Sequence, residues 1–255
     1  MSDNLCRKGS IFCFSAFHLK TAACILMVID HVGLVIFPYV QILRIIGRLS
    51  FPIFAYFISE GCKYSKNKAK RLGIILGIGI LYLIFYYIYD SSVYGNIFLT
   101  FSVSISVIYF FQYAKHKILL EFKVYKLILC VILVTLVLWM LYLLFDLVHF
   151  EYGYTGMLVP VFVSLFDFMD IPAPKWLKAM DNQAIKLICL ALGLILLSFN
   201  ANLGNMQFFC LLSLPILALY NGHPGKTKYK YSFYIFYPAH LAIIQLIAYM
   251  LSAIN

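Results

Sequence analysis

The sequence predicts an all-α integral membrane protein, a polytopic bundle of about nine transmembrane helices. Of its 255 residues, 64% are hydrophobic and 12% are charged, whereas soluble domains carry roughly 25% charged residues. Apolar stretches recur along the whole chain, and most approach the roughly 20 residues that a helix needs to cross a bilayer. An open sheet is excluded, because its edge groups would find no hydrogen-bond partner in hydrocarbon.

The expected spans follow one another with short connections, and together they form one domain over residues 1–255. They cover 19–38, 41–62, 72–89, 97–113, 124–145, 154–169, 186–199, 206–220 and 231–252. Since the sixth and seventh are short, a count of eight or ten stays open. Residues 1–18 are expected to form a short cytoplasmic segment. Pro172, Pro174 and Trp176 indicate that the 170–186 connection lies in the membrane interface.

Basic residues set the expected orientation. With the N-terminus inside, eighteen of the twenty Lys and Arg residues fall on the cytoplasmic side of the nine spans, as the positive-inside rule requires. In chain order they are Arg7, Lys8 and Lys20; Lys63, Lys66, Lys68, Lys70 and Arg71; Lys115, Lys117, Lys123 and Lys126; Lys175, Lys178 and Lys186; and Lys226, Lys228 and Lys230. The opposite loops carry Asp90, Asp146 and Glu151. The net charge of +10 is therefore mainly a signal of topology, which also suits anionic lipid or a phosphorylated ligand.

Several classes of protein and site are disfavoured by the same sequence. The chain has no soluble basic domain that could hold nucleic acid, and no Gly-rich phosphate loop. Its seven cysteines include no CxxC pair and none lies in an outer loop, so a disulfide framework is not expected. A metal site is not expected either, because compact His spacing is lacking and two nearby arginines would repel a cation.

The first span places Asp30 and His31 beyond the middle of the membrane. Adjacent helical residues point about 100° apart, so the two side chains do not face each other. Asp30 therefore needs another partner, and an arginine is the obvious one. His31 suits a general base, since its pKa lies near neutrality. The alternative is a hydrogen-bonded pair that only joins two helices.

The second span carries Arg44 and Arg48, four residues apart and thus on one helix face at a similar depth. One guanidinium could neutralise Asp30, and the other could stabilise an oxyanion or hold a carboxylate. In the structural alternative the second arginine only extends toward water. Pro52 is expected to loosen the helix just beyond them. Glu60, near the inner end, is expected to pair with a lysine of residues 63–71.

The last span brings Tyr234, Tyr237 and His240, with His240 near the middle of the membrane and in range of His31. A stripe of tyrosines is more often a packing surface than a site, but a second histidine at this depth favours a shared polar cavity. The mouth of such a cavity could be formed by polar residues predicted on the outer side, Asn96, Glu151, Gly153, Gly156 and Gln207.

These residues stand in blocks that resemble the TraX family of membrane proteins, and the resemblance extends over nearly the whole chain. The blocks are Asp30–Gly33, Arg44–Ala55, Ser59–Gly61, Asn96–Thr100, Glu151–Gly156, Leu219–Gly222 and Tyr234–His240. Glu151 stands where the family has aspartate. More distantly, Lys20 precedes His31 by eleven positions, which is similar to a pair in the wider group of membrane acyltransferases.

The resemblance implies acyl transfer, since the family's namesake acetylates the N-terminus of a pilin. The donor would be acetyl-CoA, and the acceptor an amine or hydroxyl on a peptide N-terminus, an amino sugar or a cell-surface glycan. His31, Asp30, Arg44, Arg48 and His240 would form the catalytic group, with His31 as base or as an acetylated intermediate. The donor would meet Lys20, Lys63, Lys66, Arg71 and Tyr237, and the acceptor Glu60, Asn96, Glu151, Gln207 and Tyr234. No metal is implied.

Two other functions stay open at this point. A proton-coupled secondary transporter of a small anion could use the same polar residues, although the inverted repeat that would favour it is not found. A non-catalytic scaffold or immunity factor would explain the basic loops, but it leaves five polar groups in lipid without a purpose. The expected location is a bacterial inner or plasma membrane, and an oligomer is left open.

Overall fold

A computed structural model describes residues 14–90, 95–120, 123–169, 171–199, 205–226 and 232–254. Most of these residues are helical, and short turns connect the helices. Within those ranges the only β-type pairings are two isolated bridges, Phe14 with Tyr220 and Gly95 with Phe150. The chain is thus all-α, as predicted. Arg7, Lys8, Lys228, Lys230, Tyr231, Cys6 and Cys13 lie outside the described residues, as does most of the predicted segment 1–18.

The chain divides into two compact units, and the first joins its two ends. Residues 1–57 and 198–255 make up this unit. Its helices are α1 (Ala16–Val35), α2 (Gln41–Gly47), the first half of α3 (Ser50–Tyr64), the 3-10 helix η2 (Asn205–Leu212), α10 (Ser213–Ala218) and α11 (Ser232–Ile254). Helix α1 packs against both α2 and α11, and α2 packs against η2. The helices predicted at the two ends of the chain, α1 and α11, therefore pack against each other.

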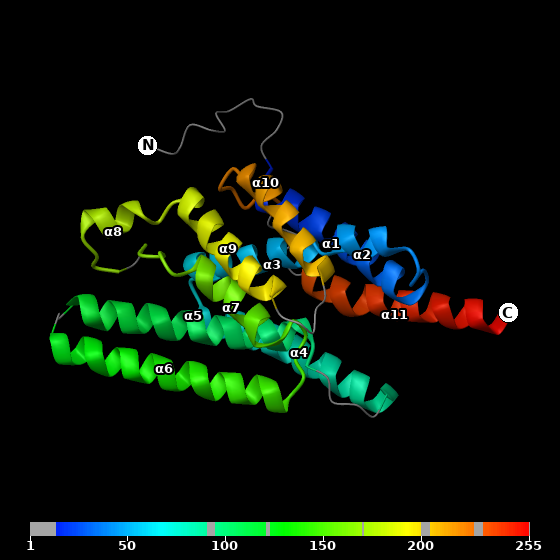
Figure 1. Ribbon diagram of the computed structural model, residues 1–255, viewed down its shortest axis with the longest axis horizontal. Helices are drawn as coiled ribbons and strands as arrows, with labels where there is room; N and C mark the ends of the chain where they lie inside the picture. Colours follow the sequence, from blue (N-terminus) through cyan, green and yellow to red (C-terminus); the bar gives the residue numbers. More distant parts are fainter. Residues whose placement is uncertain are drawn as a thin grey trace. The chain divides into compact units, whose positions relative to one another are not determined.

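The second unit holds residues 58–197. After the second half of α3 it contains α4 (Lys68–Asp90), α5 (Ile97–Leu120), α6 (Val124–Leu147), α7 (Gly153–Val163), the short α8 (Lys175–Ala179) and α9 (Gln183–Ser198). Helices α5 and α6 run side by side, as Figure 1 shows in green, and α5 also packs against α4 and α7. The buried centre of this unit is therefore built around α5.

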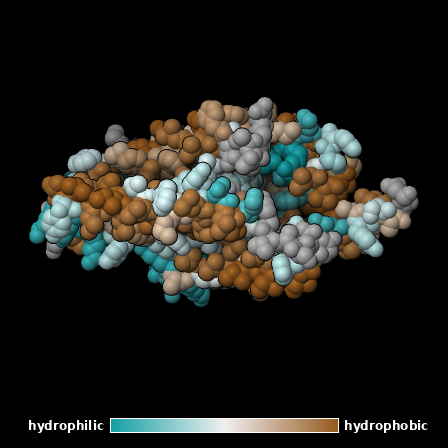
Figure 2. Space-filling view, turned by 60° about the horizontal axis from the view of Figure 1, so that its bottom comes forward, coloured by the Kyte–Doolittle hydropathy of each residue, from teal (hydrophilic) through white to brown (hydrophobic). Residues whose placement is uncertain are grey.

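Six helical stretches of the described chain are long and apolar enough to cross a membrane, and three of the nine expected spans are shorter. The six are 16–35, 41–64, 68–88, 97–120, 124–147 and 232–253; the shorter apolar helices are 153–163, 183–198 and 206–218. Large hydrophobic side chains are exposed all along α6, and Figure 2 shows hydrophobic side chains over much of the face in view. An apolar surface of this kind belongs in lipid, so the chain is a membrane protein.

Two boundaries differ from the prediction, and both change where a lysine stands. Helix α5 continues to Leu120 rather than ending near residue 113, so Lys115 and Lys117 are helical. Lys115 Nζ donates to the carbonyl oxygens of Ser164 (3.2 Å) and Leu165 (2.7 Å). Helix α9 begins at Gln183, so Lys186 also lies within a helix. The predicted bounds 97–113 and 186–199 were therefore too short at these ends, whereas the cytoplasmic placement of both lysines stays a prediction.

Candidate functional site

Two glycines let α1 and α2 approach closely enough to bring their charged residues together. A Cβ added at Gly47 would lie 2.2 Å from the Cβ of Asp30, and one added at Gly33 would lie 2.7 Å from the Cβ of Leu43. Any larger residue would thus push the helices apart. Ser50 reinforces the contact, since its hydroxyl donates to the carbonyl of Ala23 at 2.9 Å. The site begins at this close crossing.

Arg44 is the partner that Asp30 was predicted to need. Its Nη1 lies 2.7 Å from Asp30 Oδ2 and also donates to the Asp30 carbonyl oxygen at 3.2 Å. Both side chains are largely buried, so each charge stabilises the other where solvation is poor. Asp30 Oδ1 is buried and has no hydrogen-bond partner among the described residues. One carboxylate oxygen is therefore left to accept a hydrogen bond from a ligand or water.

His31 and His240 meet, as their similar predicted depth suggested. His240 Nε2 lies 3.4 Å from His31 Nδ1, and the ring centroids are 5.0 Å apart at an interplanar angle of 74°. The ring of Phe236 stacks on His240, with centroids 5.2 Å apart, and Tyr237 contacts it edge-on. His240 is buried and His31 is partly exposed. The pair joins α1 to α11 inside the first unit.

The carbonyl groups around the two rings assign their tautomers. His240 Nδ1 lies 2.9 Å from the carbonyl oxygen of Phe236, so this nitrogen carries the proton and Nε2 is an acceptor. His31 Nδ1 lies 2.8 Å from the carbonyl oxygen of Met27 and faces the His240 acceptor, so it too carries the proton. The lone pair of His31 therefore stands on Nε2, on the other side of its ring, where it can accept a proton.

Arg48 differs from Arg44, because its Nε is buried without a hydrogen-bond partner in the described structure. It follows the end of α2, at a two-residue break before α3, and Pro52 lies in the first turn of α3. The break fits the predicted effect of Pro52. Helix α2 packs against η2, which carries Gln207 and Cys210. Gln207 is 0% exposed, and neither its nitrogen nor its oxygen has a hydrogen-bond partner there.

The predicted donor-binding residues are divided between the two units. In the first, Tyr237 is buried at His240, and Lys20 Nζ lies 5.1 Å from the Phe57 ring; Tyr234, predicted to meet the acceptor, is half-buried in the same unit. Lys20 and His31 share α1, roughly 16 Å apart along its axis at 1.5 Å per residue. In the second unit, Lys66 is exposed and Arg71 Nη2 donates to the Ile58 carbonyl oxygen at 3.3 Å. Neither unit by itself holds all five predicted residues.

Glu60 is buried and pairs with Lys186, not with a lysine of residues 63–71 as predicted. Lys186 Nζ also lies 3.6 Å from Asp181 Oδ1, and the same oxygen is 2.6 Å from Lys63 Nζ. These four residues form a charge network in the second unit. Asp181 and Asp167 were not predicted from the sequence; Asp181 lies between Lys178 and Lys186, which was an available signal, whereas no lysine lies within seven positions of Asp167.

Asn96 and Glu151, predicted at the cavity mouth, close the N-terminal end of α5. Asn96 Oδ1 accepts from the backbone N–H groups of Phe98 (3.0 Å) and Leu99 (3.3 Å), and its Nδ2 donates to the carbonyl of Gly79 (2.8 Å). Glu151 Oε2 accepts from the Ile97 N–H at 3.0 Å. These bonds satisfy donors that a helix start leaves open. Both residues therefore have a structural use, and their role toward a substrate stays a prediction.

The described residues contain no group of three or more His, Cys, Asp or Glu side chains placed to hold a metal ion. What the first unit does assemble is a proton acceptor on His31, a second imidazole behind it, an ion pair, and an arginine with an unused donor. This set can move a proton and stabilise a developing negative charge.

Comparisons with known proteins agree with the blocks found in the sequence. A family model described as TraX protein matches residues 15–248. The chain is 27% identical over 256 residues to the probable fimbrial assembly protein FimC, serogroup H1, of Dichelobacter nodosus, and the match covers 91% of the chain and 94% of that protein. It is 45% identical over 62 residues to an uncharacterized protein of Rickettsia prowazekii (strain Madrid E), covering 24% and 25% of the two chains. No solved structure matches significantly.

Proposed function

Because the chain belongs to the TraX family, with a matching region that runs through all the residues of the first unit's polar cluster, we propose that it is an integral membrane acetyltransferase. It takes the acetyl group of acetyl-CoA from the cytosol and passes it to an amine or hydroxyl. The observation that carries the proposal is the contact between His31 and His240; the same unit holds Arg48, whose Nε has no partner among the described residues.

His31 acts as the general base. As the acceptor nitrogen or oxygen attacks the thioester carbonyl carbon, its proton passes to His31 Nε2. The imidazolium that forms is supported at Nδ1 by the Met27 carbonyl oxygen (2.8 Å) and the lone pair of His240 Nε2 (3.4 Å). His240 thus resembles in role the group that orients the histidine of a catalytic triad.

Arg48 stabilises the oxyanion of the tetrahedral intermediate. A guanidinium in a water-poor site is a strong donor to a developing negative charge. Arg44 is held on Asp30 at 2.7 Å, which fixes α2 against α1 and so sets the place of Arg48 one turn later. When the intermediate collapses, the carbon–sulfur bond breaks, and His31 returns the proton to the sulfur of coenzyme A.

A peptide N-terminus is the acceptor that we favour. The support is that the D. nodosus relative is a probable fimbrial assembly protein, because a fimbria is assembled from polypeptide subunits. We place the protein in a bacterial plasma membrane, with the acceptor entering from the outer side. An amino sugar or a cell-surface glycan offers the same nucleophiles and serves as the comparison in the assay.

The test is acetyl transfer by the purified protein in neutral-lipid nanodiscs, with free coenzyme A and acetylated peptide measured by mass spectrometry. We expect transfer by the wild type and a loss of roughly 10²- to 10⁴-fold in kcat for His31→Gln, which removes the base. His149→Gln is the matched control, because His149 is an exposed histidine of the second unit, and it should keep wild-type rates.

Two results would count against the proposal. If His31→Gln transfers acetyl groups as fast as the wild type, His31 is not the base. If the wild type releases no coenzyme A with any of the three acceptors, acetyl transfer from this donor is excluded, and proton-coupled transport of an anion becomes the function to measure.

A further inference from the structure

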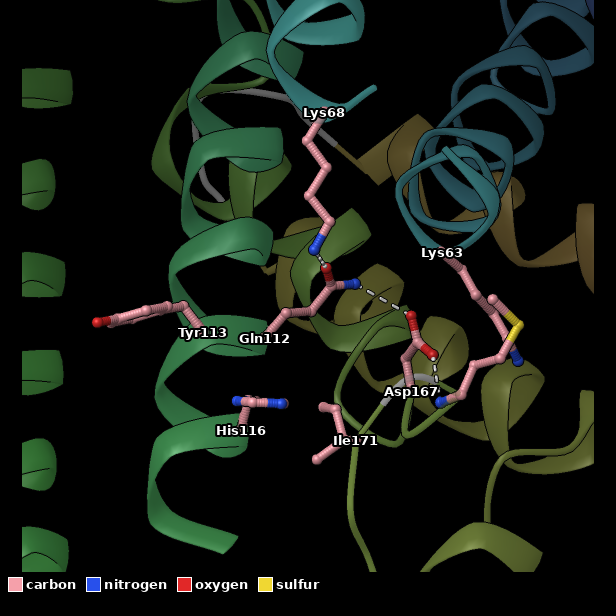
Figure 3. A pocket seen from close by; sticks show the side chains of 8 residues that line it. Lys63, Lys68, Gln112, Tyr113, His116, Asp167 and Ile171 are labelled. Atoms are coloured by element: carbon pink, nitrogen blue, oxygen red, sulfur yellow. Dashed lines mark hydrogen bonds between the residues drawn. The ribbon is translucent and has the colours of Figure 1, made fainter. Parts of the chain in front are cut away.

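A pocket of the second unit, far along the chain from His31, is lined by residues that could bind phosphate. Its volume is about 290 Å³, and its walls include Lys63, Lys68, Gln112, His116 and Asp167. Figure 3 shows Lys68 pointing toward Gln112 and Gln112 pointing toward Asp167, while Tyr113 points away from them. Lys68 Nζ lies 3.1 Å from Gln112 Oε1, and Gln112 Nε2 lies 3.1 Å from Asp167 Oδ2. The hydrogen bonds thus hold three polar side chains on one wall.

Donors in this wall remain available. An ammonium has three N–H groups and a carboxamide has two, so Lys68 and Gln112 each use only part of their capacity on the bonds given above. Within the described residues, Lys68 has no carboxylate partner; its other contact is with the ring of Tyr109, 5.3 Å away. Lys63 also keeps two donors beyond its bond to Asp181. The pocket therefore presents several hydrogen-bond donors and few groups that could accept hydrogen bonds from them.

The charge around the pocket is positive as well. Among the residues that line it, Lys63 and Lys68 are cationic and Asp167 is the one carboxylate. Lys63 also pairs with Asp181 at 2.6 Å, so Lys68 is the lining cation that no carboxylate of the described structure neutralises. A cation without a counterion in a partly enclosed site favours an anionic ligand.

We propose that this pocket binds the phosphorylated nucleotide end of coenzyme A, with Lys68 as its main phosphate ligand and Lys63 and Gln112 as further donors. The inference rests on the proposed function for the identity of the ligand, but not for its phosphate chemistry. Lys68 is the first residue of α4, so the positive end of the helix dipole adds to its charge. This replaces Lys20, Lys66 and Tyr237 of the sequence-based set as the nucleotide-binding residues.

The experiment measures dissociation constants by calorimetry in neutral-lipid nanodiscs, for coenzyme A, inorganic pyrophosphate and pantetheine. Lys68→Gln should weaken coenzyme A and pyrophosphate by about tenfold or more, the loss expected for one charged hydrogen bond. It should leave pantetheine unchanged, because pantetheine carries no phosphate. Lys70→Gln is the matched control, since Lys70 is exposed on the same helix and does not line the pocket; it should change each value less than about twofold.

The experiment distinguishes a wrong assignment of the pocket from a wrong assignment of the enzymatic activity. Equal coenzyme A affinity in the wild type and Lys68→Gln, or equal losses for Lys68→Gln and Lys70→Gln, overturns the pocket even where His31-dependent transfer is intact. Binding of coenzyme A that depends on Lys68, without any transfer, supports the pocket and removes the proposed function. A phospholipid that co-purifies with the wild type and is lost in Lys68→Gln, with unchanged coenzyme A affinity, would assign the pocket to a lipid headgroup and contradict the proposal.

Discussion

At the scale of single residues, the two arginines of the second span have different surroundings although they stand on one helix face. Arg44 is held by Asp30 through a 2.7 Å contact. Arg48 has a buried Nε without a partner among the described residues, and it ends α2, which packs against the helix η2 that carries Cys210 and Gln207. A buried donor that is left unused costs roughly 1–3 kcal/mol. Such a cost is common at sites where a ligand supplies the missing partner.

Arg48→Gln tests that difference. We expect kcat to fall by roughly 10²- to 10³-fold, as when an oxyanion donor is removed, with little change in the affinity for acetyl-CoA. The midpoint of thermal unfolding should stay the same or rise, because the substitution removes a donor that has no partner. A large fall in unfolding midpoint with normal kcat would instead give Arg48 a structural role. Steady-state kinetics and thermal unfolding in detergent provide both numbers.

The sequence was sufficient for the contacts of the first unit that follow from charge and depth. Asp30 lies among apolar residues, so it required a cation, and the arginines four residues apart were the nearest at that depth. His31 and His240 were expected to meet for the same reason. The pairing of Glu60 with Lys186 was not predictable in this way, because positive-inside counting treats every terminal lysine as solvated. Of the charged residues that line the pocket, Lys63 was assigned to the donor from the sequence, whereas Lys68 and Asp167 were not, because one sequence does not show which side chains of separate helices face each other.

At the scale of helices, the crossing of α1 and α2 depends on Gly47. Gly47→Ala would place a Cβ 2.2 Å from Asp30 Cβ, so the helices must separate and the 2.7 Å contact between Arg44 and Asp30 must lengthen. We expect a loss of about 3 kcal/mol in the free energy of unfolding, in the range for a disrupted buried ion pair, together with loss of transfer. Equilibrium unfolding in mixed micelles measures the first quantity.

Gly77→Ala is the matched control on α4, since a Cβ there meets nothing within 4 Å. Alanine is the better helix former, so the control should be neutral or stabilising by about 0.5–1 kcal/mol. Equal destabilisation by the two substitutions would show that glycine matters for general helix flexibility rather than for the approach of α1 to α2.

Helix lengths were less predictable than helix positions. Every expected span contains a helix, yet 153–163 and 183–198 are short, and 206–218 is divided between η2 and α10. Hydropathy alone cannot distinguish a short apolar helix packed inside a protein from one that faces lipid. Helices α7 and α9 pack inside the protein along part of their surface, since they carry buried residues such as Met157, Val159, Leu190 and Leu194.

At the scale of the whole molecule, the distribution of lysine and arginine predicts which connections face the cytosol. Tyr39, which is 95% exposed between α1 and α2, is expected outside, and the exposed Lys66 between α3 and α4 inside. In intact cells a membrane-impermeant maleimide should therefore label Tyr39→Cys, and should label Lys66→Cys only after permeabilisation. The unmodified protein gives the background from its native cysteines. Labelling in the opposite pattern would reverse the orientation.

Glu60 and Lys186 stand 126 positions apart, so the ribosome delivers the carboxylate well before its lysine. At roughly 5–20 residues per second, the interval is about 6–25 s. During that time the carboxylate of Glu60, in the last two turns of α3, has no cation from α9, and lipid would not solvate its charge. We therefore expect the inner end of the nascent α3 to stay at the water boundary until α9 inserts. A truncated chain that ends before residue 186 would keep this charge without a counterion. We expect membrane quality control to recognise and degrade such chains.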